Sequence, residues 1–183
     1  MLAGNPAYEL PGDYESIATV TLSTTTATVT FSSIPSTYSH LQIRGIARDN
    51  DANALGSNNI TLQFNSDTGN NYAFHYLYGD GSSAQAGNGT SQPIMLAGKL
   101  TNTNAITSNF STTVIDILDY GNTNKYKTIR VLSGFDNNGS GLMFYESGLW
   151  QSTSAVTSLD IKCGGASFVA NSHFALYGIK GAA

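Results

Sequence analysis

The sequence predicts an all-β protein, an antiparallel two-sheet sandwich of jelly-roll type. Short runs of Thr, Val, Ile, Tyr and Phe alternate with period 2 between clusters of Gly, Asn, Ser and Asp, whereas helical periodicity is nearly absent. Strands at this spacing, joined by turns such as YGNTNKY and FDNNGSG, are typical of sandwiches. At 183 residues the chain is long enough to bury one hydrophobic core without disulfides.

The first fourteen residues differ from the rest, because two prolines interrupt them and their apolar residues do not alternate. One interpretation is a disordered terminus. The other is an extended arm over residues 1–14, ahead of a sandwich domain over residues 15–183. A purely solvating tail has little use for apolar side chains, so we predict that the arm docks on a neighbouring subunit. Its candidate interface residues are Leu2, Tyr8, Leu10 and Tyr14.

Strand patterns begin directly after this arm. Residues 18–22 and 27–31 each carry an alternating apolar face, and the Ser-Thr-Thr-Thr stretch between them predicts a hairpin. Residues 40–48 and 59–65 follow as strands, separated by a long polar loop. In residues 72–78 both faces are apolar or aromatic, which predicts an interior strand.

Residues 79–91 contain no side chain large enough to anchor a core, and we interpret them as a flexible excursion. Further strands are expected at 94–100, 110–120, 126–134, 142–150, 156–163 and 173–180. Alternating faces place these side chains in or near the core: Phe31, Leu41, Ile43, Phe64, Phe74, Val114, Leu118, Leu159, Ile161, Phe174 and Leu176.

Composition excludes several classes of partner. Charged residues are 11% of the chain, against roughly 25% in typical domains. With 8 Lys+Arg against 12 Asp+Glu the net charge is −4, and no basic stripe could neutralise a phosphate backbone. We therefore expect no nucleic acid and no membrane as partner. The sequence also lacks a secretory signal pattern and an apolar stretch of membrane-spanning length.

No catalytic residue is expected, and the protein is predicted not to be an enzyme. Asp116 and Asp119 fall on opposite faces of one strand, so they cannot converge like a glycosidase pair. Whichever of them is buried needs a partner, and Arg130 on the next strand is the candidate. The three histidines have no neighbouring Ser or Cys in a nucleophile setting, and we interpret them as structural: His40, His75 and His173.

No cofactor and no metal site are expected. The segments DNDAN, NSDTGN and FDNNGSG supply oxygen ligands of the kind that calcium prefers. None has the spacing of a complete calcium loop, and the same residues are what tight turns require, so turn chemistry is the preferred interpretation. The abundant tyrosines and Trp150 could stack on sugars or lie in a core or interface, and the sequence leaves both open.

Several segments resemble a family of β-rich virion structural proteins of tailed bacteriophages of marine and cyanobacterial hosts. They span nearly all of residues 14–181: YESIATVTL, FSSIPSTYSHLQIRG, LQFNSDTGNNYAFHYLYGDGSS, VIDILDYGNTNKYKTIR, GLWQSTSAVTSLDI and HFALYGIKG. The resemblance implies a non-enzymatic component of a virion, made in the host cytoplasm, and it brings no catalytic residues.

The chain has no repeats or coiled coil from which a fibre shaft could be built. Within the resemblance, this favours a capsid decoration protein, a cement or knob, which binds the major capsid protein or other virion proteins as a homotrimer. The alternative is a receptor-binding or glycan-binding head of a tail fibre, with a host-surface glycan as its partner. An exposed strip of Tyr or Trp on one sheet would distinguish a carbohydrate-binding module.

Overall fold

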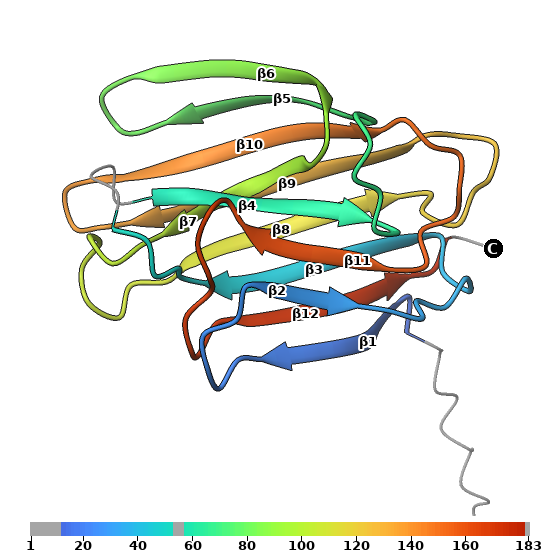
Figure 1. Cartoon of the computed structure of the whole chain (residues 1–183), viewed down its shortest axis with the longest axis horizontal. Helices are drawn as coiled ribbons and strands as arrows, with labels where there is room; N and C mark the ends of the chain where they lie inside the picture. Colours follow the sequence, from blue (N-terminus) through green and yellow to red (C-terminus); the bar gives the residue numbers. More distant parts are fainter. Residues whose placement is uncertain (1–11, 53–56, 182–183) are drawn as a thin grey trace, which may run out of the picture.

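The computed structural model describes residues 12–52 and 57–181, and every regular element in these ranges is a β-strand. The strands form two antiparallel sheets that pack face to face (Figure 1). In spatial order, the larger sheet consists of β1 (Tyr14–Thr21), β12 (His173–Ile179), β3 (His40–Ala47), β8 (Ser111–Leu118), β9 (Lys127–Asp136), β10 (Gly141–Trp150), β5 (Tyr72–Gly79) and β6 (Ala84–Gln92). The smaller sheet consists of β2 (Thr28–Phe31), β11 (Leu159–Cys163), β4 (Ser57–Phe64) and β7 (Met95–Thr101). The predicted two-sheet sandwich is confirmed, and its jelly-roll connectivity stays a prediction.

The core lies between the sheets, where alternate side chains of each strand are buried. In the larger sheet Ile43 of β3 lies in register with Ile115 of β8, and both are fully buried. In the smaller sheet Leu62 of β4 lies in register with Ile161 of β11, and both are again fully buried. These side chains belong to one cluster, so the two sheets share a single core.

Most of the predicted core is confirmed, but the orientation of β8 is not. Val114 and Leu118 are only half-buried, because the opposite face of β8 carries the core residues Ile115 and Ile117. Phe74 is also half-buried. The buried members of the predicted set are Phe31, Leu41, Ile43, Phe64, Leu159, Ile161, Phe174 and Leu176.

The predicted hairpin over residues 18–31 is wrong, because its two halves lie in different sheets. β1 pairs with β12 in the larger sheet, and β2 pairs with β11 in the smaller one. The connecting segment is tied instead to the chain that precedes β12. The Leu22 amide donates to the Ser172 carbonyl at 2.9 Å, and Thr26 and Phe168 exchange backbone hydrogen bonds. Ala18 and Val20 of β1 thus pack, partly buried, against the core from the larger sheet, whereas Val29 and Phe31 of β2 are buried in it from the smaller sheet.

Residues 79–91 are not a flexible excursion, since most of them form the edge strand β6. This strand pairs along its length with β5, and the turn between the two strands is closed around Asp80. The β5–β6 hairpin is an insertion between β4 and β7, which pair directly with each other. It extends the larger sheet beyond the edge of the smaller one (Figure 1). The expected interior position of β5 is confirmed, because β10 pairs on its other side.

Most of the predicted arm lies outside the described residues, including Leu2, Tyr8 and Leu10. Tyr14 is the first residue of β1 and lies in register with Ile179. Its side chain is 39% exposed, its ring centroid lies 5.0 Å from that of Tyr177, and the Arg44 guanidinium lies 5.5 Å from its centroid. The arm as an assembly device stays a prediction.

Candidate functional site

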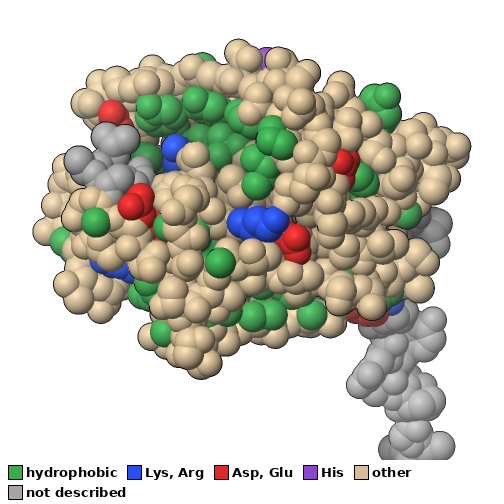
Figure 2. Space-filling view, in the orientation of Figure 1, with side chains coloured by type: hydrophobic (Ala, Val, Ile, Leu, Met, Phe, Trp, Pro, Cys, Tyr) green, Lys and Arg blue, Asp and Glu red, His purple; other side chains and the backbone are tan. Residues whose placement is uncertain are grey.

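A cleft opens between the inner face of the β5–β6 hairpin and the β7 edge of the smaller sheet. Two adjoining hollows of about 310 and 700 Å³ form it, and Lys99 of β7 lines both. Figure 2 shows hydrophobic side chains gathered in this hollow below the hairpin, with a basic side chain among them. The cleft exists because the hairpin overhangs the smaller sheet, which leaves part of the larger sheet's inner face uncovered.

The floor of the cleft is a row of aromatic rings on β5. Phe74, Tyr76 and Tyr78 occupy alternate positions, so their side chains point to the same face. Ring centroids lie 6.4 Å apart between Phe74 and Tyr76 and 6.3 Å apart between Tyr76 and Tyr78, with interplanar angles of 29° and 30°. Phe144 of β10 extends the row, 5.2 Å from Tyr76. The three β5 rings are half-buried, whereas Phe144 is fully buried.

Two glycines of β6 let these rings lie flat across the edge strand. A Cβ at Gly89 would lie 2.5 Å from Cζ of Phe74, and a Cβ at Gly87 would lie 2.5 Å from the hydroxyl oxygen of Tyr76. Any larger residue would therefore displace the ring beside it. The aromatic floor therefore requires small residues in β6, which explains the low-complexity composition of that strand. The rings in turn give the glycines of this edge strand the apolar contact that they lack side chains to make.

Polar groups line the rim of the cleft above the aromatic floor. Asn59 and Thr61 come from β4, and Gln85 and Gln92 come from β6. The Lys99 ammonium donates to Oδ1 of Asn59 at 2.7 Å and lies 5.8 Å from the ring centroid of Phe144. Burial opposes the charge of this ammonium and lowers the pKa of Lys99. The rim thus offers amide and hydroxyl groups and one cation.

Glu146 is an unusual residue beside the site, fully buried and not part of the cleft lining. It lies on the inward face of β10, in register with Tyr76 and Val131, and is fully buried. Among the described residues neither of its carboxyl oxygens has a hydrogen-bond partner. Burial raises the pKa of Glu146 to about 9, and the Lys99 charge opposes this only in part. The carboxyl group therefore keeps its proton at neutral pH.

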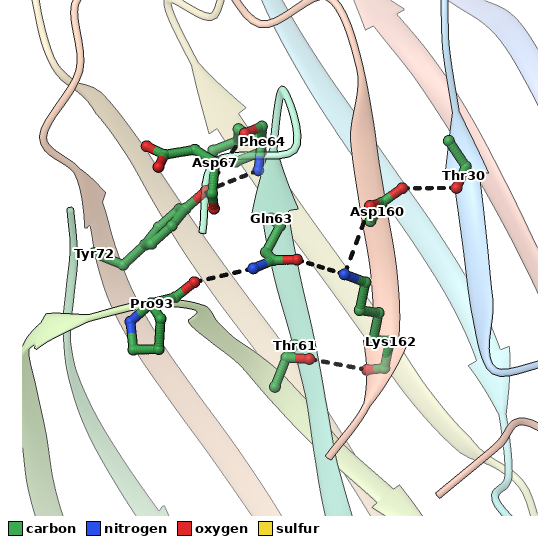
Figure 3. A network of polar contacts seen from close by, with 9 residues as sticks. All are labelled: Thr30, Thr61, Gln63, Phe64, Asp67, Tyr72, Pro93, Asp160 and Lys162. Carbon is green, nitrogen blue, oxygen red and sulfur yellow. Dashed lines mark hydrogen bonds and ion pairs between the residues drawn. The ribbon is translucent and has the colours of Figure 1, made fainter. Parts of the chain in front are cut away.

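A polar network on the smaller sheet fixes the chain where the hairpin rejoins it (Figure 3). The Gln63 amide donates to the Pro93 carbonyl at 3.0 Å, and its oxygen accepts from the Lys162 ammonium. Lys162 also pairs with Asp160 at 3.6 Å, and Asp160 accepts from the Thr30 hydroxyl at 2.6 Å. The β6–β7 connection, which forms one wall of the cleft, is in this way tied to three strands.

A second network holds the other end of the hairpin, where the chain leaves β4. The Tyr72 hydroxyl accepts from the Phe64 amide at 3.0 Å and donates to the Asp67 carbonyl at 3.1 Å (Figure 3). Partial desolvation opposes the charge of the Asp67 carboxylate, but the hydrogen bonds that it accepts from the Trp150 indole at 2.7 Å, the Asn71 side-chain amide and the Gly69 amide together lower its pKa. Burial raises the pKa of Tyr72 to about 12. Both ends of the hairpin are therefore anchored in the sandwich.

The acidic and basic residues singled out in the sequence do not form one site. Asp116 lies on the outward face of β8, where it accepts from Gln42 at 2.7 Å; Arg130 lies opposite it in register. Asp119 lies after the end of β8 and pairs with Lys125 at 2.7 Å. His40 accepts from the Asp119 amide, His173 bonds to Thr21, and His75 is exposed on the outer face of the larger sheet.

The three candidate calcium segments use their oxygens in turns. Asp67 accepts from the Gly69 amide, Asp136 from the Asn138 amide, and Asp49 from the Asp51 amide. Within residues 12–52 and 57–181 no three His, Cys, Asp or Glu side chains gather so that they could hold a metal ion. Cys163 is a free, buried thiol, and burial raises its pKa.

The outer face of the larger sheet carries a second notable surface. Leu132, Tyr145 and Leu77 lie in register across β9, β10 and β5, and each is 43% exposed or more. Met143 and Ile46 are exposed on the same face. We call Leu132, Tyr145 and Leu77 the outer row.

Comparison with known proteins gives no family. No protein-family model matches the sequence, and no curated protein is significantly similar to it. No helix in the described part of the chain is long and apolar enough to cross a membrane. The function proposed below therefore depends on the geometry of the cleft.

Sequence reasoning found part of the cleft. The alternating aromatic residues of β5 were identified, although both faces of that strand were expected to be covered, and one face is solvent-exposed at His75 and Leu77. Lys99 and Glu146 were not assigned to a site. The inward position of a Glu between Phe144 and Trp150 in MFYESGLW is the signal that could have singled it out, because buried carboxyl groups are rare.

Proposed function

We propose that the protein is a non-enzymatic glycan-binding module whose ligand lies along the aromatic floor of the cleft. The observation that carries the proposal is the row of Phe74, Tyr76 and Tyr78, open to solvent along one side of a cleft with polar rims. Aromatic faces pack against the apolar C–H faces of sugars, while rim amides and hydroxyls can hydrogen-bond to sugar hydroxyls. A largely apolar cleft with a few converging polar groups is the usual anatomy of a binding site.

Several rings in a row suit an extended chain of sugar units better than a single sugar. The networks that anchor both ends of the hairpin support the proposal, because they fix the rings before the ligand arrives. Pre-organised rings lower the ordering cost of binding.

The carboxyl groups near the cleft support binding rather than hydrolysis. Glycoside hydrolysis ordinarily needs two carboxyl groups on either side of the scissile bond. Glu146 is fully buried and does not line the described cleft; the acidic residue that does is Asp80, whose Oδ1 accepts from the Ser82 and Ser83 amides at 2.8 and 2.7 Å. These bonds lower the pKa of Asp80 and commit it to the hairpin turn.

Affinity electrophoresis and titration calorimetry against a panel of polysaccharides test the proposal. Tyr76→Ala should weaken binding at least about tenfold, which corresponds to ~1.4 kcal/mol. Tyr126→Ala is the matched control, because Tyr126 is 51% exposed and does not line the cleft. If the native protein binds no polysaccharide of the panel, or if Tyr76→Ala binds like the native protein, the proposal is wrong.

A second candidate is the capsid decoration role that the sequence resemblance implies, and the outer row favours it. Contiguous exposed apolar side chains on a sheet face are typical of protein interaction surfaces. In this candidate the outer face packs against another virion protein, and the cleft stays accessible. The same chain would serve as the receptor-binding head of a fibre if the cleft binds a host-surface glycan.

Mass spectrometry of separated capsids and tails would distinguish these two locations. Leu132→Asp should prevent addition of the purified protein to particles that lack it. Thr128→Asp is the control on the same face of β9, away from the outer row. Equal addition of both variants would count against an interface at the outer row.

A further inference from the structure

We infer that the cleft selects sugar chains with an anionic substituent and that Lys99 is the residue that binds this group. The inference rests on the proposed function and names the class of glycan. The shared chemistry is one negative charge with acceptor oxygens, supplied by a uronate carboxylate or by a sulfate ester.

Lys99 is positioned for such a contact. It lies where the two hollows of the cleft meet, beside the aromatic floor, with its ammonium 5.8 Å from the Phe144 centroid. The Asn59 side chain accepts one hydrogen bond from this ammonium at 2.7 Å and thereby orients it. An ammonium has three donors, so two remain for a ligand. A sugar chain that lies along β5 would pass within reach of Lys99.

The Lys99 ammonium has no carboxylate partner, unlike the ammonium groups of three other lysines in the described residues. Lys125, Lys162 and Lys180 pair with Asp119, Asp160 and Glu15. The Lys127 ammonium donates to three backbone carbonyls, those of Asn122, Lys125 and Thr153. Lys99 has the neutral Asn59 amide instead, and no carboxylate of the described residues lies within 4.0 Å of its ammonium.

The carboxyl group that could neutralise Lys99 does not do so. Glu146 is the acidic residue that would interact electrostatically with the Lys99 ammonium, but its buried carboxyl group keeps its proton at neutral pH because burial raises its pKa to about 9. A partly desolvated cation beside an aromatic ring therefore keeps a net positive charge. An anionic group on the ligand compensates the Lys99 ammonium for the water contacts that it has lost through burial, whereas a neutral sugar chain does not. A chain with amino substituents would be rejected by like charge.

The test uses the full-length protein and three polymers of matched length: polygalacturonate, a sulfated galactan and fully methyl-esterified polygalacturonate. The native protein should bind at least one of the two anionic polymers about tenfold more tightly than the neutral one. Lys99→Gln should lose this preference while its affinity for the neutral polymer changes less than about twofold. Lys99→Arg should keep the preference, which shows that charge, not packing, is responsible. Lys125→Gln is the control at a lysine outside the cleft and should behave like the native protein.

Each result has a distinct meaning. Preference for only one of the anionic polymers upholds the inference and identifies the source of the charge. Tyr76-dependent binding without charge preference, or a preference that survives Lys99→Gln, overturns the inference and leaves the proposed function standing. Absence of Tyr76-dependent binding to every polymer overturns the proposed function, and the inference with it. Thermal unfolding midpoints of Lys99→Gln and Lys99→Arg that equal the midpoint of the native protein establish that both variants are folded.

Discussion

Glu146 is a single buried side chain that destabilises the native state. A buried carboxyl group without a hydrogen-bond partner is costly, and its ionised form costs much more. The protein avoids ionisation by keeping the proton, which raises the pKa of Glu146 to about 9. The unfolded chain has no such reason to keep it, since an exposed Glu loses its proton near its ordinary value of 4.5. Stability must therefore depend on pH at this residue.

We predict that the protein becomes less stable as pH rises from about 5 toward about 9 and that Glu146→Gln removes much of this dependence. Over this interval the native state holds a proton that the unfolded state has lost. The free energy of unfolding then falls by up to ~1.4 kcal/mol per pH unit. Burial raises the pKa of Asp49 to about 6, so this residue also lowers the free energy of unfolding as pH rises toward 6. Urea denaturation at pH 5, 6, 7 and 8 measures both slopes.

The neutral amide of Gln fits the space of the carboxyl group and does not titrate. Glu146→Gln should therefore have the greater stability advantage over the native protein at pH 8. Asp116→Asn, which removes a half-buried carboxylate bonded to Gln42 on the outward face, serves as the control. Parallel slopes for the native protein and Glu146→Gln would contradict a buried, protonated Glu146.

At the scale of elements, the β5–β6 hairpin joins an aromatic strand to a strand of small residues. The pair depends on contact between its members, because Gly87 and Gly89 leave the space that Tyr76 and Phe74 fill. The resulting floor is half-buried and belongs to an edge of the larger sheet. Local changes here should affect the site more than the sandwich.

If the proposed glycan binding is correct, we predict that Gly89→Val weakens it at least about tenfold and changes the free energy of unfolding by less than ~1.5 kcal/mol. The new side chain would displace the Phe74 ring, since even a Cβ would lie 2.5 Å from Cζ. The strand is at the sheet edge, so the core stays intact, and Val favours strand structure. Calorimetric titration and urea denaturation measure the two effects. Ala86→Val on the exposed face of β6 should leave binding unchanged, and a similar loss for both variants would contradict this account.

The elements also show where sequence patterns suffice. Period-2 alternation located β3, β4 and β12 because one face of each is clearly more apolar. It could not orient β8, where Val114 and Leu118 oppose Ile115 and Ile117 at nearly equal hydrophobicity. It missed β6 because AQAGNGTSQ has no apolar face, and that strand depends on its tertiary neighbour β5. The hairpin over residues 18–31 was wrong because nearness in sequence does not decide which sheet a strand joins.

At the scale of the whole molecule, one core joins the two sheets. The aromatic cluster around Trp150 bridges them, since its ring lies 5.5 Å from Phe64 of β4 and 6.4 Å from Tyr72 of β5. A protein built in this way should unfold as one unit. The cleft belongs to the same scale, because residues 74–78, 96–99 and 144–146 meet only when the sheets are packed. No local pattern could have predicted that meeting.

We predict that Ile43→Ala costs about 2–5 kcal/mol of the free energy of unfolding and shifts a single transition. Ile43 is fully buried on β3, an interior strand of the larger sheet, and its core cluster includes residues of both sheets. Trp150 fluorescence and far-UV circular dichroism should report the same midpoint. Leu77→Ala, at 57% exposure on the outer face, should change stability by less than ~0.5 kcal/mol. Separate midpoints for the two probes would argue against a shared core.

The direct pairing of β4 with β7 has a consequence for how such a protein can diversify. The chain leaves the smaller sheet after β4 and returns at the neighbouring strand, so the segment between them starts and ends close to the same place. The entropic free-energy cost of closing such a loop rises slowly, by about 0.6 kcal/mol for each doubling of the loop length. Changes of length or composition in the β5–β6 turn and the edge strand β6 should thus disturb the remaining strands little, provided that Tyr72 and the pairing of β5 with β10 are kept. Selection can therefore change this segment, and with it the proposed binding cleft, while the other strands of the sandwich stay the same.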